Sequence, residues 1–550
     1  MAEIKQFQYL MKKKILIANP FSGIWLHSLP EAYLINHLST EFEIYKLVCD
    51  DIFQNHCTVM ESCGINIEDD TKIKIRTCNE CKKSNELLVN NFEFTSINIS
   101  DYISNNERIS IDTLLVNSKV SDLIEYTIDG IEIGKISLYE IILKFKKTNF
   151  EFNEIEEKYF RQYFKSTLLT FYSIKNILNS FNFNLIFSYS PQYSIPGVCL
   201  SYANKLGIKT FLIEGSSNIF DRYKSVRLWN WEKYGLINPA LEFWNHKKTI
   251  NLPYNSIRKA HKHVKSLMKG TSFSVYSEPQ KGNFNVFNFY KIPRDAKILL
   301  ATMSSYDEVF SAYVIKKFPS NKYISSVYKD QFEWILDLIN YVSKIDNTYL
   351  IVRVHPRTFS NKRENIIAKE SNELVNIFNN LPENVKINWP SEKISLYDIL
   401  PQVNALLTAW SATSIEALYY GLPVITYDQH LPSFPKNIHL TGLSRAEYYK
   451  NINRVLSDDN NKQLNYKNAI DWWAFNSIGV IEHPNFIRDI LNDYFGINGI
   501  KVFYFLNKYF KFSICLIEII YFKFFNTGKK EIKYFTLNNL DSIYQINFEK

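Results

Sequence analysis

The stretch that decides the fold reads ALLTAWSATSIEALYYGLPVITY, residues 405–427. The apolar run Ala405–Ala409 predicts a buried strand, Thr413–Tyr420 has the pattern of a helix, and Pro423–Tyr427 predicts a second strand. Gly421 stands where such a helix would stop. A strand, a helix and a strand in this order predict a parallel βαβ unit.

The same alternation extends on the N-terminal side of this unit. It predicts strands at Lys297–Met303, Thr348–Val354 and Val385–Trp389, and helices at Asp330–Ile345, Ser371–Asn379 and Leu396–Leu400. Repeated alternation of this kind predicts a doubly wound parallel sheet. We therefore expect residues 296–497 to form one α/β domain of the doubly wound type.

The first half of the chain has a similar alternation of predicted strands and helices, but it is interrupted. Predicted strands are Lys14–Asn19, Glu43–Cys49, Asn184–Tyr189 and Lys209–Ile213, and predicted helices are Pro30–Leu38, Ile195–Leu206 and residues 248–270. We expect residues 1–270 to form a second Rossmann-like domain. Residues 83–180 are polar and predict a helical insertion, with helices at Ser137–Lys146 and Asn153–Leu178. Residues 271–295, rich in Ser, Pro, Gly and Asn, are the predicted linker.

Composition excludes several classes of protein. With 46% hydrophobic and 22% charged residues, the chain is not disordered, and 16 Gly and 17 Pro in 550 residues exclude a collagen-like architecture. The net charge of 64 − 56 = +8 permits an anionic partner. We expect no nucleic acid, because the lysines are dispersed and no nucleic-acid-binding motif is found.

Targeting signals and cysteine usage indicate the compartment. The N-terminus has no apolar run with a small-residue cleavage site, and no stretch of about 18 uncharged apolar residues predicts a membrane-spanning helix. Seven cysteines do not make a disulfide scaffold. We therefore expect a cytoplasmic protein.

The tail, residues 498–550, has a composition of its own. Ile500–Phe525 is rich in Phe, Tyr, Ile and Leu, with Lys501, Lys508, Lys511 and Lys523 interspersed. A basic, aromatic, amphipathic segment is typical of the membrane interface, so we expect peripheral attachment to the inner face of the cytoplasmic membrane. The alternative is a terminal helix that packs back on its own domain.

Several cysteines gather near the N-terminus. Cys78-x-x-Cys81 has the spacing of a metal-ligand pair, and Cys49 and Cys57 would complete a tetrahedral structural zinc site. The alternative is a set of ordinary buried or exposed thiols.

Two groups of residues point to phosphate chemistry. Arg353, His355 and Arg357 directly follow a predicted strand and can bind or protonate a phosphate. Ser411, Thr413 and Ser414 gather where a helix starts, and these hydroxyls with the first-turn amides predict an anion site. The alternatives are a satisfied buried histidine at 355 and an ordinary helix cap at 411. The second His-Pro pair, His483-Pro484, follows no strand, and we expect it to be structural.

A carboxylate stands at the corresponding place in the first half. Glu214 lies at the C-terminal end of a predicted strand, the edge at which open α/β sheets bind ligands. The alternative is an ion-paired surface carboxylate.

Taken in order, these motifs resemble a known family. Ser304-Ser305-Tyr306-Asp307-Glu308, His355-Pro356 and the run Ser411–Ile425 are similar to GT-B glycosyltransferases of bacterial capsule and lipopolysaccharide synthesis. The branch that they most resemble contains the CMP-sialic acid and CMP-Kdo transferases. The resemblance covers about residues 295–430 and, more loosely, 184–220.

The resemblance implies a fold and roles for single residues. It implies two Rossmann-like α/β domains whose parallel sheets face a central cleft. His355 would contact the nucleotide phosphate and help it leave, Ser411, Thr413 and Ser414 would bind that phosphate, and Glu416 would reach the ribose hydroxyls. Glu214, followed by Gly215, matches the general base, although Ile213 stands where the family has another acidic residue. Asp307 or Glu308 is the reserve candidate. The remaining expected nucleotide-sugar contacts are Ser304, Ser305, Glu308, Arg353, Pro356 and Arg357.

The activity that this resemblance implies is sugar transfer. We expect an inverting, metal-independent glycosyltransferase that requires no cofactor for catalysis. It would use a nucleotide-sugar donor, with a CMP-sugar favoured over UDP- and GDP-sugars, and a surface polysaccharide or lipid-linked glycan as acceptor. Two alternatives stay open: a CDP-polyol phosphotransferase of teichoic-acid-like polymer synthesis, and a non-catalytic capsule assembly subunit that keeps the nucleotide fold.

Overall fold

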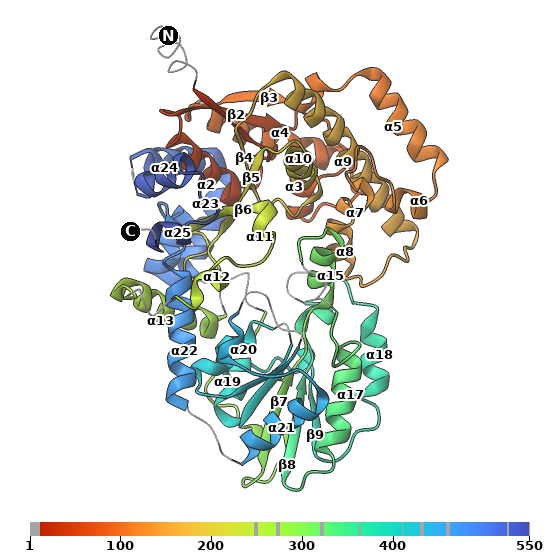
Figure 1. Ribbon diagram of the computed structural model, residues 1–550, viewed down its shortest axis with the longest axis vertical. Helices are drawn as coiled ribbons and strands as arrows, with labels where there is room; N and C mark the ends of the chain where they lie inside the picture. Colours follow the sequence, from red (N-terminus) through yellow and green to blue (C-terminus); the bar gives the residue numbers. More distant parts are fainter. Residues whose placement is uncertain are drawn as a thin grey trace.

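The computed structural model describes residues 12–246, 251–270, 276–318, 324–361, 365–409, 411–428, 434–457, 462–524 and 527–548. Trp410, Phe525, the start of the predicted linker (271–275) and the start of the predicted helix 248–270 lie outside these residues. The chain forms two α/β domains, each built on a largely parallel sheet (Figure 1). The predicted fold class is confirmed.

The first sheet has the strand order β13-β6-β5-β4-β1-β2-β3. Strands β1 to β5 are mutually parallel, β6 runs antiparallel to β5, and β13 pairs antiparallel with β6. The strands span Lys13–Ile17 (β1), Phe42–Val48 (β2), Thr95–Asn98 (β3), Leu185–Tyr189 (β4), Lys209–Gly215 (β5), Ser225–Asn230 (β6) and Ile481–Glu482 (β13). The order reverses between β1 and β4, as in dinucleotide-binding folds.

The second sheet is parallel throughout its six strands, in the order β12-β11-β10-β7-β8-β9. They span Lys297–Thr302 (β7), Thr348–Arg353 (β8), Val385–Asn388 (β9), Ala405–Thr408 (β10), Val424–Tyr427 (β11) and Leu440–Gly442 (β12). Relabelled in chain order, this is the 3-2-1-4-5-6 arrangement, and the order reverses between β7 and β10. Ligands bind such sheets outside the carboxyl ends of the strands at this reversal.

Helices cover both faces of the first sheet. Along β1, Leu16 faces the helices α9 and α10, whereas Ile15 and Ile17 face α2 and the C-terminal helices, because successive side chains of a strand point to opposite faces. The helices of this half are α2 (Trp25–Asn36), α3 (Thr58–Ser62), α4 (Thr71–Val89), α5 (Asn105–Asn117), α6 (Val120–Ile124), α7 (Ile133–Ile136), α8 (Tyr139–Phe145), α9 (Glu154–Ser180), α10 (Ser194–Lys205) and α11 (Trp231–Tyr234).

The helices of the second half follow the same plan. They are α12 (Ala240–Trp244), α13 (Tyr254–Lys269), α14 (Val286–Tyr290), α15 (Tyr306–Val314), α17 (Gln331–Val342), α18 (Glu370–Ile377), α19 (Leu396–Ile399), α20 (Thr413–Tyr419), α21 (Arg445–Leu456) and α22 (Lys462–Asn476). Three helices complete the chain: α23 (Ile487–Phe524), α24 (Lys529–Leu537) and α25 (Tyr544–Phe548).

The sequence predicted a first domain at 1–270, a linker at 271–295, a second domain at 296–497 and a tail at 498–550. The packing of the hydrophobic cores divides the chain at other places. Ala240 and Trp244 of α12 and Ala260 and Val264 of α13 belong to the core of the second sheet, where α13 packs against α22. Strand β3 lies within the predicted helical insertion 83–180, yet it forms the edge of the first sheet. The rest of that segment is mainly helical.

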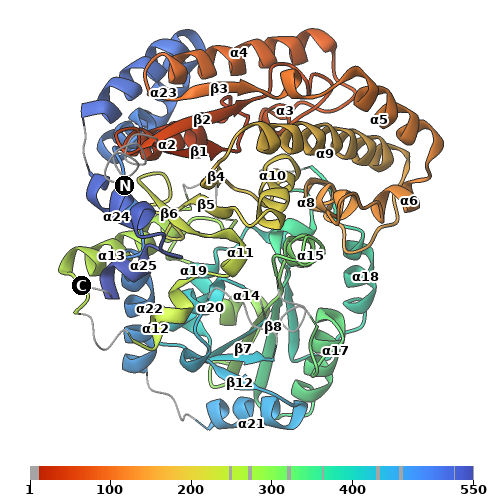
Figure 2. The same cartoon turned by 45° about the horizontal axis from the view of Figure 1, so that its top comes forward.

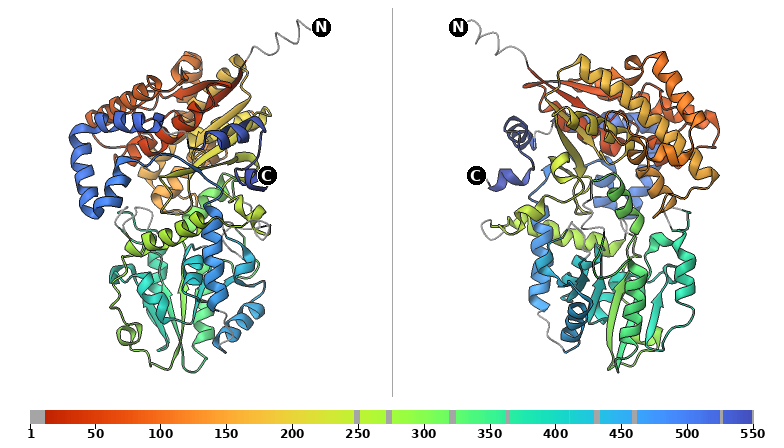
Figure 3. Two further views of the ribbon diagram at one scale, coloured as in Figure 1. Left: turned by 90° about the vertical axis from the view of Figure 1, so that its left-hand side faces the viewer. Right: turned by 45° about the vertical axis from the view of Figure 1, so that its right-hand side comes forward.

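The C-terminal helices α23 and α24 return to the first domain, so this domain is built from two separate parts of the sequence. Ile519 and Phe522 of α23 and Ile532 and Phe535 of α24 are buried in the first domain's core, beside α2 (Figures 2 and 3). One face of the tail therefore packs on the protein, which was the alternative to membrane contact. Within the described ranges, every helix is too short or too polar to cross a bilayer.

Candidate active site

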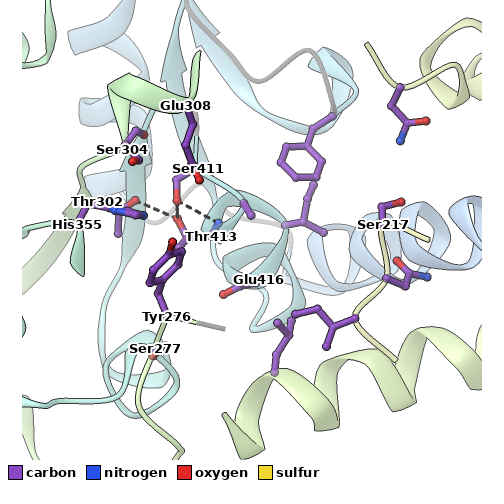
Figure 4. A pocket seen from close by; sticks show the side chains of 18 of the residues that line it. Ser217, Tyr276, Ser277, Thr302, Ser304, Glu308, His355, Ser411, Thr413 and Glu416 are labelled. Atoms are coloured by element: carbon purple, nitrogen blue, oxygen red, sulfur yellow. Dashed lines mark hydrogen bonds between the residues drawn. The ribbon is translucent and has the colours of Figure 1, made fainter. Parts of the chain in front are cut away.

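A cavity of about 610 Å³ lies between the two domains, at the carboxyl ends of β7 and β10 where the second sheet reverses its order (Figure 4). The first domain contributes the end of β5 and the loop that follows it, and helix α13 closes the same side. The predicted residues that line it are Glu214, Ser304, Ser305, Glu308, Arg353, His355, Pro356, Ser411, Thr413 and Glu416. Arg357 and Ser414 are not among the lining residues. The structure thus brings both predicted motif groups to one site.

A chain of hydroxyl groups joins the ends of β7 and β10. Thr302 Oγ1 lies 3.0 Å from Thr413 Oγ1, and Thr413 Oγ1 donates to Ser411 Oγ at 2.8 Å (Figure 4). Thr302 was not predicted as a site residue, although it lies at the end of β7 and within a predicted strand. The three hydroxyls form one polar wall of the cavity.

Helix α20 contributes less to this wall than its sequence suggested. It has only seven residues, so few peptide dipoles add up at its start. Its N-cap is Ala412, not Ser411, and Ser411 Oγ accepts a weak hydrogen bond from the Thr413 amide at 3.3 Å. An anion at this wall would therefore be held by side chains.

Ser304 has an unused hydroxyl at the cavity. The residue is 6% exposed, and its Oγ has no hydrogen-bond partner within the described part of the chain. Its backbone is fixed, because the Ser304 amide donates to Gln331 Oε1 at 3.2 Å and the Gln331 amide group donates back to the Ser304 carbonyl at 3.3 Å. A buried hydroxyl without a partner is uncommon in folded proteins. At a cavity wall, it indicates a place that a ligand completes.

His355 has a fixed orientation at the end of β8. Its Nδ1 accepts a hydrogen bond from the Arg357 amide at 3.2 Å, so in the neutral ring the proton is on Nε2. The ring of Tyr276 meets it edge-on, with ring centroids 5.6 Å apart. Its Nδ1 therefore faces its own loop, and the residue lines the wall of the cavity.

Arg353 supplies a half-buried positive charge near His355. Its guanidinium donates to Asn388 Oδ1 and, at 3.2 Å, to the Ile394 carbonyl. Burial lowers the pKa of Arg353 to about 10, which leaves it cationic at neutral pH. The nearby charge attracts anions into the cavity.

Glu416 follows one turn after the hydroxyl wall, on α20. Burial raises the pKa of Glu416 to about 7, while the hydrogen bond from Tyr397 and the charge of Arg353 act in the opposite direction. A carboxyl group with such a pKa can accept or donate a hydrogen bond near neutrality. This suits recognition of a hydroxyl.

Arg357 has a different role from the one expected. Its guanidinium donates to Asp307 Oδ2 at 3.0 and 2.8 Å and to the Leu143 carbonyl at 2.6 Å, and both members of this ion pair are buried. The bond to Leu143 ties the loop after His355 to the mainly helical segment of the first domain. Asp307, a reserve candidate for the base, is occupied by the same pair.

Glu214 approaches the cavity from the opposite domain. It lies on β5, and its Oε2 accepts a hydrogen bond from the Arg227 guanidinium at 2.5 Å. Arg227 is itself held by the Gly215 carbonyl at 3.1 Å. Glu214 therefore forms an ion pair, as the alternative to a catalytic role assumed. This pair lies at the wall of the cavity. Glu308, another carboxylate that lines this cavity, points toward Ser411 in Figure 4.

His263 is a cavity residue that the sequence analysis missed. Its Nδ1 accepts a hydrogen bond from the Ile219 amide at 2.9 Å, and its ring meets Trp473 edge-on at 5.0 Å. Burial, helped by the charge of Arg222, lowers the pKa of His263 to about 3, so the ring is neutral with its proton on Nε2. No local pattern on α13 distinguishes this histidine from His261, because its partner comes from a distant loop.

The four cysteines predicted as zinc ligands line a small apolar pocket of the first domain. Among the residues that the structure describes, no group of three or more His, Cys, Asp or Glu side chains is placed to hold a metal ion, so the predicted ligand set is not formed. Burial raises the pKa of Cys57 to about 12 and that of Cys78 to about 11, which keeps these thiols protonated. Cys81 Sγ instead accepts a hydrogen bond from the Gly23 amide at 3.1 Å.

Comparison with known proteins gives only distant structural matches. No family model matches the chain, and no curated protein does. Solved structures that share the general architecture include the Methanocaldococcus jannaschii UDP-GlcNAc 2-epimerase in complex with UDP-GlcNAc and UDP, at 14% identity over 85% of this chain and 99% of that one, with a TM-score of 0.29.

Two sugar transferases appear at the same level of similarity. The Thermosulfurimonas dismutans KpsC beta Kdo 2,7 transferase is 16% identical over 50% of this chain and 78% of its own, with a TM-score of 0.26. The calicheamicin glycosyltransferase CalG4 is 12% identical over 84% and 95%, also with a TM-score of 0.26. Similarity this low carries no argument about activity, which must rest on the cavity itself.

Proposed function

We propose that the chain is an inverting, metal-independent glycosyltransferase that takes a sugar from a nucleotide-activated donor, with a CMP-sugar favoured. The observation that carries the proposal is the pairing across one cavity. Glu214 lies on the wall from the first domain, and His355, Arg353 and the hydroxyls of Ser304 and Ser411 lie on the wall from the second. Sugar transfer needs these two kinds of group to face one reacting centre.

The phosphate of the donor would lie against the second domain. Arg353 supplies charge, His355 Nε2–H supplies a directed donor, and Ser304 Oγ supplies a buried hydroxyl that lacks a partner in the described residues. These groups stabilise negative charge that develops on the departing phosphate. Glu416, one helical turn away, would bind the ribose hydroxyls.

The reaction would proceed in one displacement. Glu214 takes the proton from an acceptor hydroxyl, whose oxygen attacks the anomeric carbon as the bond from that carbon to the phosphate oxygen breaks. The electron pair of the broken bond stays with the nucleotide phosphate, which His355 and Arg353 stabilise. A single attack from the face opposite the phosphate inverts the anomeric centre.

Glu214 is preferred over Glu308 as the base because of where each lies. Glu214 is on the first-domain wall, whereas Glu308 begins α15 on the phosphate side and points toward Ser411 (Figure 4). A negative charge beside the departing phosphate would oppose catalysis. Glu308 therefore suits orientation of the hydroxyl wall better than proton removal.

The acceptor in this proposal is a bacterial surface polysaccharide or a lipid-linked glycan. The protein would meet it at the inner face of the cytoplasmic membrane, with the C-terminal helices in contact with that surface. Support comes from the composition of α23, which carries many aromatic and basic residues. Nucleic acid has no part in this proposal.

The test is nucleotide release from a donor panel. CMP-sialic acid, CMP-Kdo, UDP- and GDP-sugars and CDP-glycerol are each incubated with the protein and a crude surface-glycan acceptor. We expect release from one sugar donor, most rapidly from a CMP-sugar, and label transfer to the acceptor. Release from CDP-glycerol alone would instead establish the polyol phosphotransferase alternative. Nucleotide binding without turnover of any donor would favour a non-catalytic assembly subunit.

His263 bears on the polyol phosphotransferase alternative. Such an enzyme would use a histidine of the first half as its base, and His263 lines the cavity. However, its Nδ1 is occupied by the Ile219 amide and its Nε2 already carries the proton, so it has no free lone pair to accept one. This favours sugar transfer with a carboxylate base.

A further inference from the structure

The C-terminal helix α23 exposes a row of large apolar side chains, which we call the α23 stripe: Phe505, Tyr509, Phe510, Ile517, Ile520 and Phe524. Each is at least 47% exposed, and Phe524 reaches 81%. At 3.6 residues per turn, the six lie within an arc of about 140°. Ile519 and Phe522, on the opposite side, are fully buried in the first domain's core. The stripe is therefore the outer face of a helix that is already anchored.

The charges around the stripe are almost all positive. From Tyr494 to Lys530 the sequence contains several lysines and a single acidic residue, Glu518. Glu518 is 2% exposed and accepts hydrogen bonds from Trp25 Nε1 at 2.7 Å and the Ile487 amide at 2.8 Å. Its charge is thus withheld from the surface, whereas Lys501, Lys508 and Lys523 are exposed.

Helix α4 adds a basic groove beside the stripe. Lys72, Arg76, Lys83 and Phe512 line a hollow of about 460 Å³ between α4 and α23, which lie side by side in Figures 2 and 3. Glu80, the acidic residue in the groove, is paired with Arg76 at 3.3 Å and with Lys511 at 2.7 Å. The groove therefore keeps a net positive charge of a kind that attracts phosphate headgroups.

We propose that the α23 stripe and the α4 groove together form a surface that docks the first domain on an anionic lipid bilayer. This deepens the membrane contact of the proposed function by naming the face and the lipid charge. Aromatic and aliphatic side chains would enter the boundary between headgroups and acyl chains, while the lysines and Arg76 meet lipid phosphates. Because its inner face is committed to the first domain's core, α23 lies along the surface and does not insert across it.

The positive charge around the α23 stripe argues against a second copy of this chain as its binding partner. Two α23 stripes facing each other would bring the surrounding lysines together, and like charges at an interface oppose association. An anionic bilayer supplies the opposite charge over the whole surface.

The test is co-sedimentation of the full chain with phosphatidylcholine vesicles, with and without phosphatidylglycerol. We expect binding at least about tenfold tighter with the anionic lipid, and weaker binding as salt is raised. The triple variant Phe505→Ser/Ile517→Ser/Phe524→Ser should lose at least about tenfold in affinity. Its control is Val116→Ser/Leu443→Ser/Leu464→Ser, three similarly exposed side chains elsewhere, which should bind as wild type.

The groove is tested separately. Lys72→Gln/Arg76→Gln/Lys83→Gln should lose at least about tenfold in affinity for anionic vesicles, and Lys119→Gln/Lys344→Gln/Lys450→Gln should not. Equal vesicle binding by all variants, or none by wild type, would overturn the proposal. Self-association that the stripe variant abolishes, with no vesicle binding, would overturn it in favour of a second copy. Nucleotide release in solution should be unchanged in all these variants, so failure here is distinct from failure of the proposed activity.

Discussion

At the scale of single residues, polar side chains at or near the cavity differ in whether they have a partner among the described residues. Arg357 and Asp307 complete each other in a buried pair, and His263 is matched to a backbone amide. Ser304 differs, because its hydroxyl is buried at the cavity and lacks a partner in the described chain. A residue that gains its partner only from a ligand should affect binding more than folding.

Ser304→Ala tests this difference. We expect CMP to bind about 10- to 150-fold more weakly, since a lost hydrogen bond to a charged group costs about 1.5–3 kcal/mol. The melting temperature should stay unchanged, because the hydroxyl has no hydrogen-bond partner among the residues that the structure describes. Calorimetric titration with CMP and a thermal melt give the two readings.

Ser311→Ala is the matched control for Ser304→Ala. Ser311 is equally buried on α15, but its Oγ donates to the Glu308 carbonyl at 2.9 Å. It should lose about 1 kcal/mol of folding stability and keep its affinity for CMP. If Ser304→Ala destabilises the fold like this control and leaves CMP binding intact, the hydroxyl is structural.

At the scale of elements, α23 is tied to the first domain by a buried carboxyl group. Glu518 accepts hydrogen bonds from Trp25 of α2 and from the first residue of α23 itself. Burial nevertheless raises the pKa of Glu518 to about 7, because these hydrogen bonds compensate only in part and the charge of Asp489 adds to the effect of burial. The folded protein therefore holds a proton at this site between about pH 4.5 and 7, where the unfolded chain has lost it.

This bound proton makes the free energy of unfolding depend on pH. The contribution of Glu518 to stability is present below about pH 4.5 and is lost as pH rises through about 7, by at most about 3 kcal/mol. In Glu518→Gln, the fall in unfolding free energy between pH 5 and pH 8 should be smaller than in wild type by up to this amount. Urea unfolding at the two pH values measures it, with the exposed Glu93→Gln as control. An identical pH dependence in wild type and Glu518→Gln would show that this carboxyl is ionised in the fold.

At the scale of the whole molecule, the chain crosses between the domains more than once. After the second sheet is complete, β13 joins the first sheet, and α23 and α24 close the first domain's core. The β5–β6 loop is bound to α22 in turn, since Asn218 Nδ2 donates to the Trp473 carbonyl and to Ser477 Oγ, each at 2.9 Å. The first domain is therefore not a continuous piece of sequence.

A truncation tests this arrangement. A chain that ends at residue 486 loses Ile519, Phe522, Ile532 and Phe535, all of them 0–1% exposed in the first domain's core. Large apolar side chains removed from a core cost about 2–5 kcal/mol each, so the truncated chain should be insoluble or lack a cooperative melt. A soluble truncated chain with the wild-type melting temperature would show that the C-terminal helices are a dispensable appendage.

The sequence predicted most strands of both sheets but missed β3, β6, β12 and β13. Buried parallel strands such as Lys297–Thr302 and Ala405–Thr408 are short apolar runs bounded by turn residues, which a local pattern can reveal. Strand β13 has two residues and exists only because β6 accepts it. No periodicity can predict such a pairing.

The site residues, too, could be predicted only where local patterns decide their positions. His355, Ser411 and Thr413 follow predicted strands, so their meeting at one edge of the sheet follows from topology. Arg357 stands only two residues after His355, but the intervening 3₁₀ turn directs it to Asp307 and away from the cavity. His263 depends on a backbone amide more than forty residues away. These outcomes are decided by tertiary contacts.

The central claim is that two walls of one cavity act together on one reacting centre. Its most direct test is the initial rate of nucleotide release from the best donor by Glu214→Gln and His355→Ala, with Glu93→Gln and His261→Ala as controls. We predict that both site variants lose at least about 100-fold in kcat, that Glu214→Gln still binds the donor, and that the controls match wild type. Wild-type rates in both site variants would contradict the account.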